Sequence, residues 1–178
     1  CCTSSNAVKI VQSLPQEIII FIPDENLGSF IAKQVPEKKI ILFKGYCDTH
    51  KSISVEEINN SKNKYPDAKL LVHPECTLSV IEKADFVGST AQIIKYATNS
   101  QYKEFIIGTD QGIIHLLQKH CPDKKFYPIS PKLICSNMKK TTLKSILNSL
   151  ETMSYEIKMD DDLINKAYLP LDRMLKVH

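Results

Sequence analysis

The chain alternates between short apolar runs and longer amphipathic stretches. Residues 18–22 are apolar at every position and mostly β-branched, and residues 68–72 form a second short run that is apolar at most positions. The first run is typical of a strand buried on both faces of a parallel sheet, and the second predicts another short strand. A polar amphipathic stretch over residues 54–64 predicts a helix between the two strands. The pattern therefore predicts an α/β fold with parallel sheets.

Part of the chain repeats at an offset of 86 residues. The matched segments are residues 3–9 with 89–95, 17–22 with 103–108, and 36–39 with 122–125. After a slip of two residues, Cys47 meets Cys135. Each copy predicts a helix, a buried strand, a second helix, a short strand, and a loop that ends in cysteine. The repeat predicts two similar α/β units.

Side chains that can cap helices recur in both copies. We expect Ser4 and Thr90 to be the N-caps of the first helix of each copy, because a hydroxyl oxygen there accepts hydrogen bonds from free amides. Asp24 and its counterpart Asp110 are expected to cap the second helices, over residues 26–34 and 112–120.

The two ends of the chain depart from the repeat. The first copy lacks a counterpart of the strand at 68–72, and we expect that strand upstream of residue 1. After Cys135 two helices are predicted, over residues 139–152 and over residues 160–175, the second interrupted near Pro170. Four apolar residues of the first tail helix recur at helical spacing and need a partner surface: Leu143, Ile146, Leu147 and Leu150.

Composition excludes several classes of protein. With 43% apolar and 24% charged residues the chain is an ordinary globular one. The net charge of +3 and the scattered lysines do not indicate a nucleic-acid-binding protein. No apolar run approaches the ~20 residues that span a bilayer, and the first residues show no secretory signal. We therefore expect a cytoplasmic protein.

Six cysteines in such a chain are expected to be reduced, and none of them forms a CxxC motif. Cys47 and Cys135 occupy equivalent loops of the repeat, which suggests a shared metal, with His50 near the first; two thiolates alone are incomplete for an iron–sulfur cluster. The other four have no counterpart in the repeat and are interpreted as small buried hydrophobes: Cys1, Cys2, Cys76 and Cys121.

Two further groups of residues could carry chemistry at the carboxyl ends of the strands. His73 and Glu75 directly follow the strand at 68–72, where an imidazole beside a carboxylate can exchange protons or bind a metal; the alternative is an ordinary polar strand end. Ser4, Ser89 and Thr90 lie where helix N-termini could hold carboxylates or phosphates, and ordinary capping is the alternative for each.

Several motifs, in order along the chain, resemble those of quinolinate synthase: Cys2-Thr-Ser-Ser-Asn-Ala-Val8, Pro23-Asp-Glu-Asn-Leu-Gly28, Gly45-Tyr-Cys-Asp-Thr-His50, Val72-His-Pro-Glu-Cys76, Ala84-Asp-Phe-Val-Gly-Ser-Thr90, Gly108-Thr-Asp-Gln-Gly112, Cys135-Ser-Asn-Met-Lys-Lys140 and Pro170-Leu-Asp-Arg-Met174. The resemblance implies a pseudo-threefold architecture of repeated three-layer αβα units, of which this chain lacks the first. It divides the chain into the remainder of a second αβα domain (1–46), a third αβα domain (47–134) and a helical tail (135–178) that packs on the missing domain.

The same resemblance implies an enzyme of NAD biosynthesis. Quinolinate synthases condense iminoaspartate with dihydroxyacetone phosphate, and their four-iron four-sulfur cluster is held by three cysteines. Cys47 and Cys135 match two of these ligands, and the third lies upstream of residue 1. By resemblance, Glu75, His73 and His50 are catalytic, whereas the substrates are bound by Ser4, Ser89, Thr90, His73 and Met138. The implied partner is an L-aspartate oxidase or dehydrogenase that supplies iminoaspartate.

Two other hypotheses remain open at this point. The chain could be a metal-free α/β fragment that binds a small anion or serves as a subunit. It could also be a structural zinc protein, with Cys47, Cys135 and His50 as ligands. Because one cluster cysteine is upstream, we expect the isolated chain to be inactive.

Overall fold

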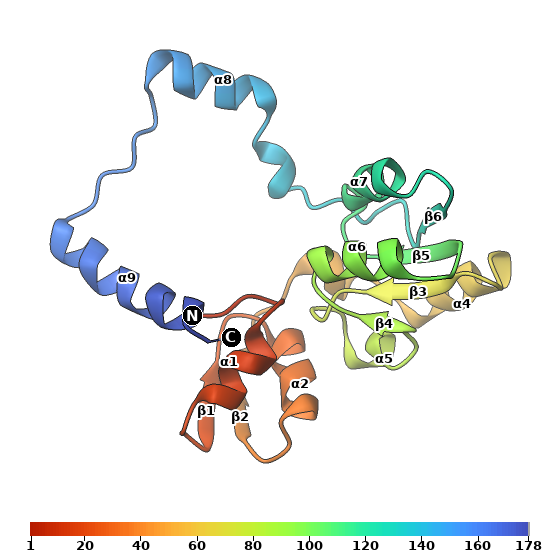
Figure 1. The fold of residues 1–178 in the computed structure, drawn as a ribbon, viewed down its shortest axis with the longest axis horizontal. Helices are drawn as coiled ribbons and strands as arrows, with labels where there is room; N and C mark the ends of the chain where they lie inside the picture. The colour runs from red at the N-terminus through yellow and green to blue at the C-terminus, as the bar shows by residue number, and fades with distance from the viewer. Residues whose placement is uncertain (178) are drawn as a thin grey trace. The chain divides into compact units, whose positions relative to one another are not determined.

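The computed structural model describes residues 1–177. Residues 3–134 form one compact unit with two parallel sheets, and residues 1–2 group with the chain from Cys135 onward. The two units are described separately below, and Figure 1 shows the elements of each. No helix within the described range is long and apolar enough to cross a membrane.

The larger unit is an α/β structure, as the sequence predicts. Its strands are β1 (Ile18–Phe21), β2 (Lys39–Leu42), β3 (Lys69–Val72), β4 (Phe86–Val87), β5 (Glu104–Gly108) and β6 (Lys125–Pro128). Its helices are α1 (Ala7–Ser13), α2 (Glu25–Gln34), α3 (Asp48–Lys51), α4 (Val55–Lys64), α5 (Leu78–Ile81), α6 (Thr90–Asn99) and α7 (Ile113–His120). One sheet pairs β1 with β2, and the other has the order β4-β3-β5-β6; every described pairing is parallel.

The hydrogen bonding of the strands follows the sequence repeat. Ile18 of β1 lies opposite Lys39 of β2, and 86 residues later Glu104 of β5 lies opposite Lys125 of β6. The bonds that precede the two pairs also match, because the Lys39 amide donates to the Glu17 carbonyl and the Lys125 amide donates to the Lys103 carbonyl, both at 2.8 Å. The pairs β1–β2 and β5–β6 are therefore built alike.

The slip of two residues also has a structural counterpart. The Glu25 amide donates to the Gly45 carbonyl, and the Gln111 amide donates to the Leu133 carbonyl, at 2.7 and 2.9 Å. Glu25 and Gln111 are 86 positions apart, whereas Gly45 and Leu133 are 88 apart. The two extra residues of the second copy thus lie between these contacts, before the cysteine.

The core of the larger unit lies on both faces of the four-stranded sheet. Along β3, Leu70 and Val72 point into one apolar cluster and Leu71 into the other, and all three are fully buried. The corresponding residues of β5 alternate in the same way. The strand predicted at residues 68–72 is confirmed, and it starts at Lys69.

The prediction that residues 18–22 are a strand buried on both faces is wrong. Ile18, Ile20 and Ile22 are 57%, 72% and 63% exposed, and Phe21 is the buried residue of β1. Phe21 packs closely under Gly28 of α2, where an added Cβ would lie 3.0 Å from the Phe21 ring. Among the described residues β1 pairs with β2 alone, so its isoleucines have no second covering layer.

The predicted caps are confirmed at one helix and wrong at three. Asp24 is the N-cap of α2, and its Oδ1 accepts a hydrogen bond from the Leu27 amide at 2.8 Å. Asp110 instead accepts from the Gly112 amide in a turn, and α7 begins afterwards with Gly112 at its N-cap. A short Asx turn has therefore replaced the cap that we expected at Asp110.

At the first helices of the two copies the cap falls on a neighbouring residue. Ser89, not Thr90, is the N-cap of α6, because its side chain and that of Gln92 bond reciprocally to each other's backbone amides. Ser4 precedes the N-cap of α1, which is Asn6. The Asn6 Oδ1 is used to bond the Thr3 amide at 2.7 Å, so it closes the preceding turn rather than capping the helix.

The smaller unit contains a 3₁₀ turn, η1 (Met138–Lys140), and the helices α8 (Leu143–Thr152) and α9 (Asp161–Leu175). The single helix predicted over 139–152 is interrupted because Thr142 has an extended backbone and caps α8 through Ser145. The interruption predicted near Pro170 is absent, since α9 continues through that residue. The four apolar residues of α8 are exposed.

Candidate active site

Three segments of the larger unit bring together the predicted catalytic side chains. His73 and Glu75 follow β3, Thr109 follows β5, and His50 belongs to the short helix α3. The His73 amide donates to the Gly108 carbonyl at 3.2 Å, which joins the ends of the two strands. The site therefore lies at the carboxyl ends of parallel strands, where ligands bind in open α/β sheets.

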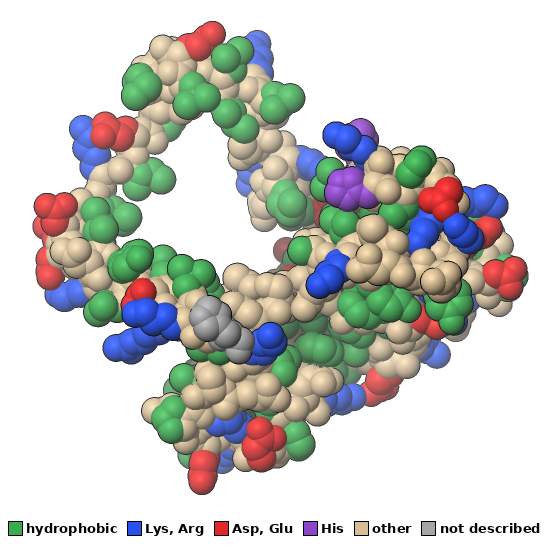
Figure 2. Space-filling view, viewed as in Figure 1, with side chains coloured by type: hydrophobic (Ala, Val, Ile, Leu, Met, Phe, Trp, Pro, Cys, Tyr) green, Lys and Arg blue, Asp and Glu red, His purple; other side chains and the backbone are tan. Residues whose placement is uncertain are grey.

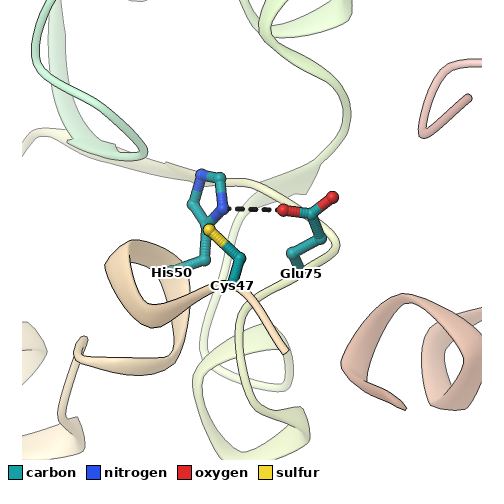
Figure 3. A group of neighbouring side chains, drawn as sticks. All are labelled: Cys47, His50 and Glu75. Carbon is teal, nitrogen blue, oxygen red and sulfur yellow. Dashed lines mark hydrogen bonds and ion pairs between the residues drawn. The ribbon is translucent and has the colours of Figure 1, made fainter. Parts of the chain in front are cut away.

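His50 is the centre of this group. Its Nδ1 lies 3.0 Å from Glu75 Oε2, and its Nε2 lies 2.9 Å from Thr109 Oγ1 (Figure 3 shows the first of these contacts). The His73 ring stacks on the His50 ring with centroids 4.2 Å apart and planes 12° apart. The structure thus brings together all three residues predicted to be catalytic.

Charge and protonation in the group follow from these contacts. The hydrogen bond from His50 lowers the pKa of Glu75, so its carboxylate is ionised at neutral pH. Burial, together with repulsion from His50, lowers the pKa of His73 to about 4, so this imidazole is neutral. The Glu75 amide donates to His73 Nδ1 at 3.3 Å, which leaves the proton of the neutral ring on Nε2. The site presents one carboxylate beside two imidazoles.

Cys47 completes a group that could bind a metal. Its Sγ, a nitrogen of His50 and a carboxylate oxygen of Glu75 lie within 4.8 Å of one another (Figure 3). Asp24 holds the backbone of this cysteine, because its Oδ2 accepts from the Cys47 amide at 2.9 Å while its Oδ1 caps α2. Burial raises the pKa of Asp24. Thiolate, imidazole and carboxylate are all ligands of iron and zinc.

Of the substrate-binding residues predicted near helix starts, Ser4 lines a cavity, whereas Ser89 and Thr90 do not. A cavity of about 200 Å³ is lined by Ser4, Ser5, Val8, Lys9, Phe30, Pro74, Val87, Gly88 and Gln92. Ser4 lines this cavity directly, and Gly88 places the start of α6 beside it. Pro74 connects the cavity to the segment that carries His73 and Glu75. Ser89 is buried and engaged in capping, and Thr90 is exposed in the first turn of α6.

The other predicted ligands belong to the smaller unit. Cys135 precedes η1, and its carbonyl accepts from the Lys139 amide at 3.2 Å, just as the Cys47 carbonyl accepts from the Lys51 amide at 2.9 Å. Met138, in η1, is 65% exposed. That Cys135 and Met138 share a site with Cys47 stays a prediction.

The interpretation of the remaining cysteines is confirmed for two of them. Cys76 and Cys121 are buried, and burial raises the pKa of Cys76 to about 12. The interpretation is wrong for Cys1, which is exposed because it precedes every packed element, and Cys2 is half-buried. The structure forms no disulfide among these free thiols.

Two residues of the site were not assigned a role from the sequence. Thr109 was part of a quoted motif, and Asp24 was expected only to cap a helix. Thr109 directly follows the buried strand β5, just as His73 directly follows β3. This position was the signal in the sequence that could have marked Thr109 as a site residue. The contact of Asp24 with Cys47 joins residues 23 positions apart and had no signal in the sequence.

Comparison with known proteins identifies the family. The family model described as quinolinate synthetase A protein matches residues 1–176. Similar curated proteins include the quinolinate synthase of Caldicellulosiruptor saccharolyticus, 55% identical over 99% of this chain and 58% of the relative, and quinolinate synthase 2 of Methanosarcina acetivorans, 49% identical over 99% of this chain and 57% of the relative. The chain thus spans a little under three fifths of the length of these relatives. Because the family model matches nearly every residue, the chain belongs to the quinolinate synthetase A family.

Proposed function

We propose that the protein containing this chain is a quinolinate synthase, which condenses iminoaspartate with dihydroxyacetone phosphate to form quinolinate, phosphate and water in NAD biosynthesis. The observation that carries the proposal is the group formed by His50, His73, Glu75 and Cys47 at the strand ends, in a chain whose relatives bear this name. The activity is assigned to the complete protein, since the chain spans about 58% of the relatives' length.

The cysteine at this site fits the proposed iron–sulfur cluster. Cys47 is half-buried, its amide is held by Asp24, and its thiol faces a histidine and a carboxylate. Cys135 would be a second ligand, and the family resemblance places a third upstream of residue 1. When bound, a four-iron four-sulfur cluster with three cysteine ligands supplies one open iron that acts as a Lewis acid.

The residues of this chain have distinct proposed roles. Condensation of an amine with a carbonyl, followed by loss of water, requires repeated proton transfer. Glu75 is ionised and accepts protons, and His50 is hydrogen-bonded to it. His73 carries a proton on Nε2, so it can donate a hydrogen bond to a substrate oxygen.

The neighbouring cavity suits the anionic groups of the substrates. Ser4 and Lys9 line it, and the N-terminus of α6 approaches it through Gly88. A hydroxyl, an ammonium group and a helix N-terminus all favour a carboxylate or a phosphate. We assign Ser4, Ser89 and Thr90 to binding these groups, with Met138 lining the site.

The proposed architecture follows from the internal repeat. Residues 1–46 would be the remainder of one three-layer αβα domain, residues 47–134 a second such domain, and residues 135–178 a tail that packs on a domain outside this chain. Repetition of the β1–β2 and β5–β6 pairs at 86 residues supports this division and a pseudo-threefold arrangement in the complete protein. We place the protein in the cytoplasm, with an L-aspartate oxidase or dehydrogenase as the source of iminoaspartate.

Cysteine variants of the complete protein test the proposal. After anaerobic reconstitution, Cys47→Ala is expected to lose bound iron and quinolinate formation, because a cluster ligand is gone. Cys121→Ala is the matched control. This thiol is buried in an apolar cluster and has no proposed ligand role, so its loss should leave iron content and quinolinate formation unchanged. Full iron content in Cys47→Ala would contradict the assignment of Cys47 as a cluster ligand. A parent protein that is colourless and binds zinc would favour a structural metal site.

A further inference from the structure

We infer that Gln92 is a positioning residue, whose side-chain amide joins the start of α6 to the turn that carries Ser4 and so holds the two sides of the neighbouring cavity at a fixed separation. The inference rests on the proposed function for its effect on substrate binding, but its structural part concerns this chain alone. Gln92 and Ser4 both line the cavity of about 200 Å³. The Gln92 Nε2 donates to the Ser5 carbonyl at 3.3 Å, which joins residues 87 positions apart.

The roles of the two amide atoms of Gln92 are set by their partners. The Ser89 backbone N–H can only donate, so the atom that lies 2.8 Å from the Ser89 nitrogen is the oxygen, Oε1. The nitrogen, Nε2, therefore faces the Ser5 carbonyl, which can only accept. With one atom the side chain serves the start of α6, and with the other it bonds the first copy of the repeat.

The first copy of the repeat shows what a side chain one methylene shorter does at this position. Asn6 is the counterpart of Gln92, 86 positions earlier. Its Oδ1 accepts from the Thr3 amide at 2.7 Å, just as the Gln92 Oε1 accepts from the Ser89 amide. An asparagine is therefore long enough for the bond within the turn. The extra methylene of Gln92 is what allows its Nε2 to reach the Ser5 carbonyl.

The two parts that Gln92 joins are each closed by local contacts. A Cβ on Gly88 would lie 2.9 Å from the Gln92 Cβ, so the glycine lets the stem of Gln92 lie against the backbone that leads into α6. On the other side, the Thr3 Oγ1 and the Ser5 Oγ are 2.7 Å apart and enclose Ser4 in the turn. The bond from Gln92 to Ser5 therefore fixes the separation of two parts that are already ordered.

The consequence for binding follows from the place of this bond. Gln92 is assigned no contact with a substrate, and it acts through the position of Ser4, which we assign to a carboxylate or phosphate of the substrates. Contacts with such a group are remote from the reacting atoms, so they stabilise the bound substrate and the transition state equally. Their loss raises KM and leaves kcat unchanged.

Three variants of the complete protein separate the bond to Ser5 from the start of the helix. Gln92→Asn keeps the bond to the Ser89 amide, as Asn6 shows in the first copy, and is too short for the bond to Ser5. Gln92→Met keeps most of the length of the side chain and loses both bonds. Glu57→Ala is the control, because it removes a reciprocal cap of the same kind from α4, outside the cavity.

The first readout is amide hydrogen exchange in cluster-free protein, followed separately over residues 3–9 and 89–95. Gln92→Asn is expected to speed exchange over residues 3–9 and to leave residues 89–95 unchanged, whereas Gln92→Met should speed exchange over both segments. In the reconstituted enzyme we expect Gln92→Asn to raise the KM of at least one of the two anionic substrates about 3–10-fold, the effect of one hydrogen bond. Its kcat and iron content should change little, and Glu57→Ala should change neither KM.

Unchanged exchange over residues 3–9 in Gln92→Asn overturns the inference, whatever the kinetics. Faster exchange with both KM values unchanged also overturns it, because the position of the turn would then not matter to the substrates. An equal rise of KM in Glu57→Ala would overturn it as well, since the loss of any helix cap would then suffice. If the complete protein forms no quinolinate at all, the proposed function fails while the exchange measurement still decides whether Gln92 holds the turn.

Discussion

Glu75 has an environment that keeps it charged while it is partly shielded from water. Its side chain is 24% exposed, and the hydrogen bond from His50 lowers its pKa. We predict that Glu75→Gln in the complete protein lowers kcat about 10²–10⁴-fold, because an amide does not accept a proton at neutral pH. Steady-state kinetics and iron analysis measure the two effects. Glu82→Gln, at an exposed position on the surface, is the control, and full activity of Glu75→Gln would make Glu75 a structural residue.

His73 predicts a specific dependence of stability on pH. Its ring binds a proton with a pKa of about 4 in the folded protein, against 6.5 for an ordinary histidine, because burial disfavours the charged form. The unfolded chain therefore binds more protons between these values, and the free energy of unfolding falls as the pH drops from 6.5 to 4. The loss for this one group is roughly 3 kcal/mol.

Denaturant unfolding of the cluster-free complete protein at pH 7, 5 and 4 measures the effect, with His73→Gln as the comparison. The variant lacks the titrating group, so its stability should decline less over the same interval. Parallel pH profiles for the two proteins would show that His73 does not titrate differently on folding.

The residues found from the sequence are those whose role depends on neighbours along the chain. His73 and Glu75 were recognised because they follow a strand, and Cys47 because the repeat pairs it with Cys135. The contact of Thr109 with His50 spans 59 positions and depends on tertiary packing, so the place of Thr109 after a strand marks the strand end but not its partner. The N-cap of α6 was misplaced by one residue, since a hydroxyl stands at two consecutive positions there.

At the scale of elements, a lysine in each copy of the repeat bonds the carbonyls at the C-terminal end of the first helix of that copy. Lys38 Nζ donates to the carbonyls of Leu14 and Gln16 after α1, at 2.6 and 2.9 Å. Lys124, 86 positions later, donates to Ala97 and Ser100 at the end of α6, each at 2.7 Å. A cation there satisfies free carbonyls and interacts favourably with the helix dipole.

We predict that Lys124→Met lowers the free energy of unfolding of the complete protein by about 1–3 kcal/mol, since charged hydrogen bonds to the helix end are lost. Methionine keeps most of the apolar stem, so the change isolates the charge. The exposed Lys119, at the end of α7, provides the control through Lys119→Met, which should change stability by less than about 0.5 kcal/mol. Equal effects of the two substitutions would refute a capping role for Lys124.

Most elements were predictable because their periodicity is strong. The second helices of both copies, the helix over 54–64 and the strand at 68–72 agree with the structure to within a residue or two. The burial of β1 was not predictable in the same way. Its sequence is as apolar as that of β3, but burial depends on what covers a strand, and β1 has one neighbouring strand among the described residues.

At the scale of the whole molecule, the described residues expose apolar side chains on several surfaces, α9 among them (Figure 2), and two others bear on association. One is the β1–β2 sheet, where Ile20 is 72% exposed. The other is α8, where Leu143 is 87% exposed and Leu147 and Leu150 are more than half exposed. Apolar surfaces of this kind in a folded chain indicate contact with other protein. In the proposed architecture both are covered in the complete protein.

We therefore predict that residues 1–178 expressed alone associate with themselves, in a manner that depends on concentration, and form no quinolinate. Light scattering during size-exclusion chromatography measures the mass, and an anaerobic assay after reconstitution measures the activity. Changing Leu143, Leu147 and Leu150 together to serine should reduce association if α8 drives it, and Ile18→Thr with Ile20→Thr should reduce it if the β1–β2 sheet does. The triple serine variant and the double threonine variant are controls for each other. A monomeric chain at all concentrations would show that these surfaces need no cover, and measurable turnover by this chain would show that the third cysteine proposed for the cluster is dispensable.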